Sequence, residues 1–215
     1  MQEITEITGM IIKAEPISEY DRRVVLLTRE RGKISAFARG ARKPNSRLLA
    51  ATNPFSFGVF KVYVGKSSYN IVDASISNYF EGLREDYESA YYGMYFLEVM
   101  DYYTRENNDE KEMLKLLYQS LRALMHEGLP NVLVRYIFEM KAMVINGEFP
   151  GVPSEGEWEE STRYAVSYIM NSGIEKLYTF TVTIPVLEEL KQIADMYRKR
   201  FVDRSFKSLE IVDNL

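Results

Sequence analysis

The hydrophobic pattern of this chain changes its period near Leu83, and that change constrains the fold more than any other feature. The first 80 residues contain five short apolar runs separated by turn residues, with no helical repeat between them. From Leu83 onward, apolar residues recur at helical spacing. We therefore expect an α+β protein, with a small closed or partly open five-stranded β-barrel followed by a helical region.

The pattern also predicts where the individual elements lie. The expected strands are residues 8–17, 23–30, 33–40, 54–65 and 68–76. Two tight turns are expected between them, at Arg31-Gly32 and at Gly65-Lys66-Ser67. The helices are expected at residues 84–105, 111–128, 132–145, 161–171 and 184–201. A Ser or Thr cap should open the fourth helix, and the apolar face of the first helix is formed by Leu83, Tyr87, Tyr91, Met94 and Leu97.

Composition excludes several classes of protein. The 215 residues are 46% hydrophobic, which is enough for a core, and they contain no cysteine. Disulfides, thiolate zinc sites and cysteine nucleophiles are therefore excluded together. No apolar run approaches the ~20 residues of a membrane span, and no secretory signal is visible. We expect a cytoplasmic protein with no membrane partner.

Positive charge is concentrated in one part of an otherwise acidic chain. The net charge is −4, yet residues 31–72 contain eight Lys or Arg and no Asp or Glu. The rest of the chain therefore sums to −12. Such a chain has no general attraction for nucleic acid, so any binding must come from a local surface.

The strand expected at residues 33–40 carries two unlike faces, because side chains alternate along a strand. One face is small and apolar and should pack inward. The other is basic with one aromatic ring, a composition that can pair with phosphates and stack on bases. The residues of this basic face are Lys33, Ser35, Phe37 and Arg39.

The neighbouring segments extend this surface. The loop after the strand adds three cations, and in the strand expected at residues 54–65 the side chains of Phe55, Phe57, Lys61 and Tyr63 are in phase with one another. Such a face can also be an ordinary solvated surface. The lack of acids and the interleaved aromatics favour nucleic-acid binding, with these candidate residues: Lys33, Phe37, Arg39, Arg42, Lys43, Arg47, Lys61 and Tyr63.

No catalytic or metal-binding constellation is visible. His126, the single histidine, lies at a predicted helix end, where we expect a cation that opposes the helix dipole. One histidine and no cysteine cannot form a zinc cluster or a triad. We expect no enzyme activity, no cofactor and no metal. Trp158 should anchor its acidic loop by packing.

A second basic cluster follows near the end of the sequence. Its cations either oppose the dipole at the end of a helix or contribute to binding, and the sequence leaves both possibilities open. The cluster consists of Arg198, Lys199, Arg200, Arg204 and Lys207.

The N-terminal sequence resembles the RecO family, the recombination mediators of bacterial DNA repair. The similarity runs through GMIIKAEPISEYDRRVVLLTRERGKISAFARGARKPNSRL (residues 9–48) and NPFSFGVFKVYVG (residues 53–65). GLRED (residues 82–86) resembles the start of the family's helical domain, and FKSLEIV (residues 206–212) resembles its C-terminal signature.

This resemblance implies an OB-fold at residues 1–80 and a helical domain at residues 81–215. It implies binding of single- and double-stranded DNA, annealing of complementary strands, and cooperation with RecR and single-strand-binding protein to load RecA, at the nucleoid. The DNA would be carried by Lys33, Arg39, Arg42, Lys43 and Arg47. Many relatives hold a four-cysteine zinc module where this chain has residues 147–160 without cysteine, so zinc is not expected.

Two alternatives remain open from the sequence. The barrel could be a protein-interaction module that docks an acidic partner, such as the tail of single-strand-binding protein, without direct DNA binding. It could also be an RNA-binding barrel of translation, since the same physics would serve both nucleic acids.

Overall fold

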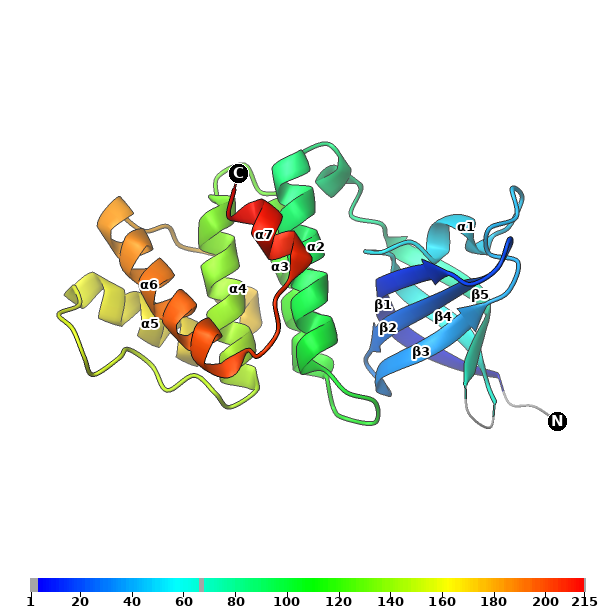
Figure 1. The fold of residues 1–215 in the computed structure, drawn as a ribbon, viewed down its shortest axis with the longest axis horizontal. Coiled ribbons are helices and arrows are strands. Elements are labelled where there is room, and N and C mark those ends of the chain that lie inside the picture. Colours follow the sequence, from blue (N-terminus) through cyan, green and yellow to red (C-terminus); the bar gives the residue numbers. More distant parts are fainter. Residues whose placement is uncertain (1–3, 66–67, 215) are drawn as a thin grey trace. The chain divides into compact units, whose positions relative to one another are not determined.

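Five strands close into a barrel in the N-terminal part of the chain (Figure 1). The computed structural model describes residues 4–65 and 68–214. The strands are β1 (Ile4–Pro16), β2 (Arg22–Thr28), β3 (Gly32–Ala38), β4 (Phe57–Val64) and β5 (Tyr69–Asn78). Their order around the barrel is β1-β2-β3-β5-β4, with β4 also paired to β1. Helices follow the barrel, so the α+β fold class expected from the sequence is confirmed.

Alternation along the strands fills the barrel with β-branched, aliphatic and aromatic side chains. A short helix that the sequence analysis did not predict, α1 (Leu48–Ala51), adds Leu48 to this core. The fully buried members include Ile7, Ile11, Val24, Leu26, Ile34, Phe60 and Val62. Small residues at Ala36 and Ala38 leave room for these larger neighbours, as the apolar face predicted for β3 requires.

The predicted position of Phe55 is wrong. β4 begins at Phe57, and Phe55 lies before it with a φ of 73°, buried, its amide donating to the carbonyl of Ile11 at 3.0 Å. This left-handed residue breaks the strand alternation, so Phe55 does not share the outward face of β4. The predicted turn at Gly65-Lys66-Ser67 lies partly outside the described residues, which omit Lys66 and Ser67.

The chain forms two compact units. The first comprises the residues up to 81 together with 97–114, and the second comprises residues 82–96 with those from 115 onward. The division into domains at residues 80 and 81 stays a prediction. The helical segments after the barrel, of which α2 and α3 belong partly to the first unit, are η1 (Glu81–Arg84), α2 (Tyr87–Tyr103), α3 (Lys111–Leu124), α4 (Asn131–Ile145), α5 (Glu160–Asn171), η2 (Ile174–Lys176), α6 (Ile184–Phe201) and α7 (Lys207–Val212). None of the described helices is long and apolar enough to cross a membrane.

The buried face of α2 differs in part from the predicted one. Leu97, and Leu83 just before the helix, are buried as predicted, but Tyr87, Tyr91 and Met94 are exposed, with Tyr87 84% accessible. The other large side chains that the helix buries are Tyr92, Tyr95, Phe96, Val99 and Met100. The apolar residues of α2 are distributed around the whole helix, so helical spacing alone cannot identify the side that faces the core.

The ends of α5 are fixed by residues distant in sequence. Glu159 precedes the helix without a side-chain cap, so the predicted Ser or Thr cap is wrong; its amide donates to the Glu189 carboxylate at 3.1 Å. At the other end, the buried Lys141 ammonium donates to the carbonyls of Ile169, Met170 and Ser172. A cation there opposes the dipole of α5 and satisfies carbonyls that the helix leaves unpaired.

Trp158 anchors the loop between α4 and α5 as predicted, but through hydrogen bonds of its indole N–H, where packing was expected. The indole N–H of Trp158 donates to the carbonyls of Pro153 (3.1 Å) and Glu155 (3.2 Å). A loop with several Gly, Pro and Glu residues is thereby held by one aromatic side chain.

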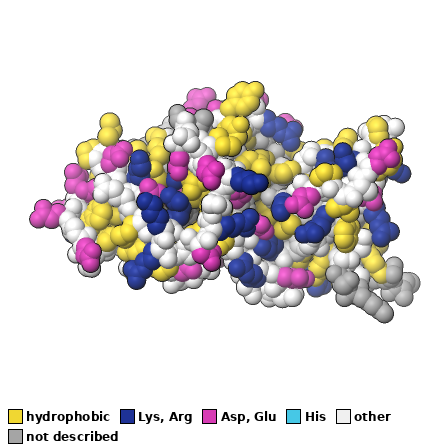
Figure 2. All heavy atoms as spheres, viewed as in Figure 1, with side chains coloured by type: hydrophobic (Ala, Val, Ile, Leu, Met, Phe, Trp, Pro, Cys, Tyr) yellow, Lys and Arg dark blue, Asp and Glu magenta, His cyan; other side chains and the backbone are white. Residues whose placement is uncertain are grey.

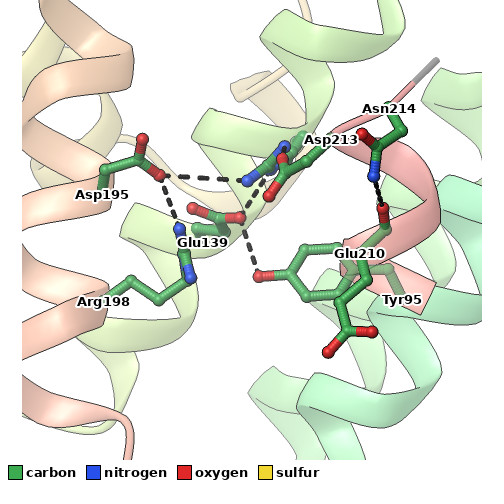
Figure 3. Close-up of polar contacts among 8 residues, drawn as sticks. Tyr95, Glu139, Asp195, Arg198, Glu210, Asp213 and Asn214 are labelled. Atoms are coloured by element: carbon green, nitrogen blue, oxygen red, sulfur yellow. Dashed lines mark hydrogen bonds and ion pairs between the residues drawn. The ribbon is translucent and has the colours of Figure 1, made fainter. Parts of the chain in front are cut away.

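A buried ionic network joins α4, α6 and α7 in the second unit (Figure 3). Arg135 of α4 contacts Glu139 at 2.8 Å and Asp213, just after α7, at 2.7 Å. Tyr95 donates to the same Glu139 oxygen at 2.8 Å. Burial disfavours the charged guanidinium, but Glu139 and Asp213 outweigh this and raise the pKa of Arg135. The network therefore fixes α7 against α4.

Candidate nucleic-acid interface

The loop after β3 carries exposed cations and rests on the connection between β1 and β2. The Asp21 carboxylate accepts a hydrogen bond from the Gly40 amide at 2.7 Å. The Arg42 amide donates to the carbonyl of Tyr20, and the Arg42 guanidinium donates to the carbonyl of Ser18, each at 2.9 Å. These bonds give the loop a defined backbone. Its exposed cations are Arg39, Arg42, Lys43 and Arg47.

Arg22 holds the segment that follows this loop. Its guanidinium donates to the Leu49 carbonyl at 3.0 Å and to the side chains of Thr52 and Asn53 at 2.9 Å each. Burial is the larger of two causes that lower the pKa of the Arg22 guanidinium, and the positive charge of Arg42 is the smaller one. Three acceptors on one guanidinium make Arg22 a structural clamp, which keeps the base of the loop in place.

None of the four loop cations has an anionic partner within the described residues. Within the part of the chain that the structure describes, neither Arg39 nor Arg47 forms an ion pair. Lys43 lies over the ring of Tyr20, with its ammonium 5.8 Å from the ring centre. Tyr20 itself is 42% exposed. The loop thus presents guanidinium groups and an aromatic ring together, a composition suited to phosphates and bases.

A row of outward side chains crosses the barrel beside this loop. Arg23 of β2 lies opposite Phe37 of β3 in the strand register, Phe37 lies opposite Asn70 of β5, and Asn70 lies opposite Tyr63 of β4. Arg23 is exposed, and the other three are half-buried. Figure 2 shows Lys and Arg side chains among hydrophobic ones over the barrel.

Sequence reasoning missed Arg23 and Tyr20. Residues 23–30 read as one continuous apolar run, so the outward face of β2 was not distinguished from its inward face. The signal was present in the alternation, because Val24 and Leu26 are buried while Arg23 is exposed. Tyr20 lies in a turn, and no local pattern predicts which ring a turn brings beneath a distant lysine.

Lys33 is set apart from the other candidates. Its ammonium lies 3.0 Å from the Asp101 carboxylate and 2.5 Å from the Asp101 carbonyl oxygen, within the same compact unit. The Lys33 side chain is 21% exposed. This pairing compensates the charge of Lys33.

Lys61 is also surrounded by acids. The Lys61 ammonium lies 3.6 Å from the carboxylate of Glu6, its neighbour on β1. Asp73 is its neighbour on β5. On β4, therefore, the positive charge of Lys61 is compensated, whereas the cations of the loop after β3 are not compensated by any described residue.

His126 lies just beyond the end of α3, and its Nδ1 accepts a hydrogen bond from the Gly128 amide at 3.1 Å. Its role as a helix-end cation stays a prediction. In the second basic cluster, Arg198 is paired with Asp195 at 2.8 Å, while Lys199, Arg200 and Lys207 are exposed.

Comparison with known proteins identifies the family. The family model "Recombination protein O N terminal" matches residues 1–80, which include the whole barrel. The model "Recombination protein O C terminal" matches residues 84–155. The chain belongs to the RecO family.

Individual relatives agree over most of the chain. It is similar to the DNA repair protein RecO of Acetivibrio thermocellus, 25% identical over 97% of this chain and 96% of that protein. The DNA repair protein RecO of Clostridium novyi is 25% identical over 96% of this chain and 93% of its own length. That of Bacillus subtilis is 32% identical, over 68% of this chain and 57% of the relative.

The basic segment that resembles the RecO family is also the segment that the structure holds in a defined, exposed loop. The basic loop quoted for the family, from Ala38 to Arg47, is the loop whose backbone Asp21 and Tyr20 hold in place. The C-terminal signature, residues 206–212, contains α7, which the Arg135 network fixes. The motif residues of this RecO-family chain therefore divide into an exposed cationic set and a buried structural set.

Proposed function

We propose that the protein acts in recombinational DNA repair as a non-enzymatic DNA-binding and strand-annealing mediator. The observation that carries the proposal is the loop after β3, where Arg39 and Arg47 are exposed without ion-pair partners in the described chain. The family name supports the process, and the relatives are named as DNA repair proteins.

The proposed chemistry follows from charge and stacking. Guanidinium groups of the loop would neutralise phosphates and release counterions, which supplies most of the affinity. Phe37 and Tyr63 would stack on unpaired bases without regard to sequence. Two strands held with their phosphate charge neutralised repel each other less, so complementary sequences can pair. We leave Lys33 and Lys61 outside the contact set, because both have acidic partners.

The family resemblance extends the proposal to partners. Cooperation with RecR, and loading of RecA on DNA coated by single-strand-binding protein, are what the RecO family implies. They rest on the resemblance rather than on a surface described above.

Fluorescence anisotropy with labelled single-stranded DNA, titrated across salt concentration, tests DNA binding. We compare the natural protein with an Arg39→Glu/Arg47→Glu double variant. The loss of two phosphate contacts should weaken binding by about tenfold or more and lower the salt slope by about 1.4, at about 0.7 per contact. An Arg29→Glu variant is the matched control, because Arg29 is exposed at the opposite end of β3 and should bind nearly normally.

The outcomes separate the alternatives. Equal affinity of the double variant, with unchanged circular dichroism, would remove the loop from the interface. Absence of DNA binding by the natural protein at low salt would instead favour a barrel that docks an acidic protein partner. If binding holds, annealing of complementary fluorophore- and quencher-labelled strands is the next assay.

A further inference from the structure

A groove in the second compact unit lies outside the proposed DNA interface. It runs between α5 and residues 179–183, which lead into α6, and has a volume of about 990 Å³. Its walls are mainly apolar and aromatic: Tyr164, Ala165 and Tyr168 from α5, Phe180 and Val182 from the facing segment, and Val186 from α6. It lies beyond the residues that the two family models match.

Contacts within the walls hold the groove open. The rings of Tyr168 and Phe180 meet edge to face with centres 5.2 Å apart. The Tyr168 hydroxyl contacts the carbonyl of Lys176 at 3.1 Å and the Thr179 hydroxyl at 3.2 Å. Tyr164, which lines the groove, is 72% exposed, and Ile184, which follows the facing segment in sequence, is 78% exposed. Large apolar side chains in water beside a preformed groove are typical of a surface that a partner covers.

The wall formed by residues 179–183 also offers free backbone groups. Its sequence, TFTVT, is rich in β-branched and aromatic residues, yet it belongs to no helix or strand. Within the described chain, the backbone groups of Phe180, Thr181 and Val182 make no hydrogen bond. Thr183 has extended φ and ψ angles of −72° and 162°. An extended segment with unpaired amides can accept an added strand.

The charge around the groove is negative. The charged side chains that line it among the described residues are Glu159 and Glu160. Glu189 adds a third carboxylate nearby, because it accepts a hydrogen bond from the Glu159 amide at 3.1 Å. Such a rim repels nucleic acid and acidic peptides and attracts cationic ones.

We propose that this groove docks an extended segment of a partner protein in which apolar and basic residues alternate. The segment pairs with the backbone of residues 180–182 as an added strand, and its apolar side chains pack against Tyr168, Phe180 and Val182. Its Lys or Arg side chains reach Glu159 and Glu160 and lie over the exposed ring of Tyr164. This inference is independent of the proposed DNA binding.

A fluorescein-labelled peptide of alternating lysine and valine residues is the probe, with the full-length chain titrated into it and read by anisotropy. A peptide with glutamate in place of lysine is the opposite-charge comparison. We expect the lysine peptide to bind and the glutamate peptide not to bind. Glu159→Lys/Glu160→Lys should weaken binding about tenfold. Thr181→Pro, which removes one amide donor at an exposed position, should weaken it several-fold.

Glu112→Lys is the matched control, because Glu112, like Glu160, is an exposed acid in the first turn of a helix. It should leave peptide affinity unchanged, and none of these variants should change affinity for single-stranded DNA. Failure of the lysine peptide to bind at low salt, preference for the glutamate peptide, or equal binding by all variants overturns the proposal. So does a concentration-dependent dimer lost in the groove variants, which would assign the groove to a second copy of the chain.

Discussion

Phe37 and Tyr63 lie on either side of Asn70, which pairs with both of them across the barrel surface. β5 thus brings into one row two aromatic residues from strands that do not contact each other. Two strand spacings separate the rings by about 10 Å. Each ring can therefore meet a different base of one strand, while the loop after β3 meets the phosphates.

Replacement of these rings should distinguish single strands from duplex. Phe37→Ala or Tyr63→Ser should weaken binding of single-stranded DNA by about 1–3 kcal/mol, the usual contribution of one stacked base. Duplex binding should change little, because paired bases are stacked on one another. Anisotropy with both substrates checks this, with Val72→Ala on the exposed face of β5 as the control. Equal losses on both substrates would contradict base stacking.

Gly32 should be the glycine that tolerates substitution least. Its φ is 65°, and an added Cβ would collide with the carbonyl of Arg105 and lie 2.8 Å from that of Asn108. Gly147 has a similar φ of 78° but open space around it. Gly147→Ala should cost about 1–2 kcal/mol of unfolding free energy from the backbone alone. Gly32→Ala should cost clearly more, as measured by urea denaturation; equal losses would show that the collision is relieved cheaply.

Asp86 should stabilise the second unit in a pH-dependent way. Its carboxylate precedes α2 and accepts hydrogen bonds from the Ser89 hydroxyl and amide, which lower its pKa below the ordinary 3.8. Because the folded pKa is depressed, this stability is present above about pH 4 and is lost as the pH falls through the folded pKa.

At pH 7, Asp86→Ala should lower the unfolding free energy by about 1 kcal/mol, as for a lost N-cap. Urea denaturation at a series of pH values checks this. The difference from the natural protein should shrink toward pH 3, and a constant difference across the series would argue against the carboxylate.

Removal of one charge from the Arg135 network should lower the unfolding free energy strongly, whereas replacement of both charges by apolar side chains should lower it little. Glu139→Ala removes the closest buried partner of the Arg135 guanidinium, leaving Asp213 and the more distant Asp195, and should cost about 3–5 kcal/mol. Arg135→Met combined with Glu139→Leu removes both charges and should recover most of that loss. Urea denaturation of the three proteins decides between these expectations. A double variant as unstable as the single one would mean that the ion pair itself, rather than its imbalance, is required.

Alternation and periodicity predicted much of this molecule. The inward Ile34, Ala36 and Ala38 and the outward Phe37 and Arg39 of β3 follow from side-chain alternation alone. The bounds of α6 were also predicted, because its apolar spacing begins at a Pro in the first turn.

What escaped prediction depends on contacts distant in sequence. Alternation places Lys33 outward, but only the fold brings Asp101 beside it. In α2, apolar residues on every side gave no preference for Tyr95 over Tyr91. The groove beside Tyr168 gave no sequence signal, because TFTVT reads as an ordinary β-type run and its lack of a strand partner is visible only in three dimensions.

The short pairing of β3 with β5 has a consequence for local opening of the barrel. Among the described residues, two pairs join these strands, Ala36 with Tyr69 and Phe37 with Asn70, whereas seven residue pairs join β2 to β3. The shortest ladder has the fewest bonds to break, so its amides should exchange with solvent sooner than those of the other ladders. Phe37 and Tyr63 lie on opposite sides of this seam. A single DNA strand stacked on both rings would bridge this seam. Bound DNA should therefore slow the local opening of the barrel between β3 and β5.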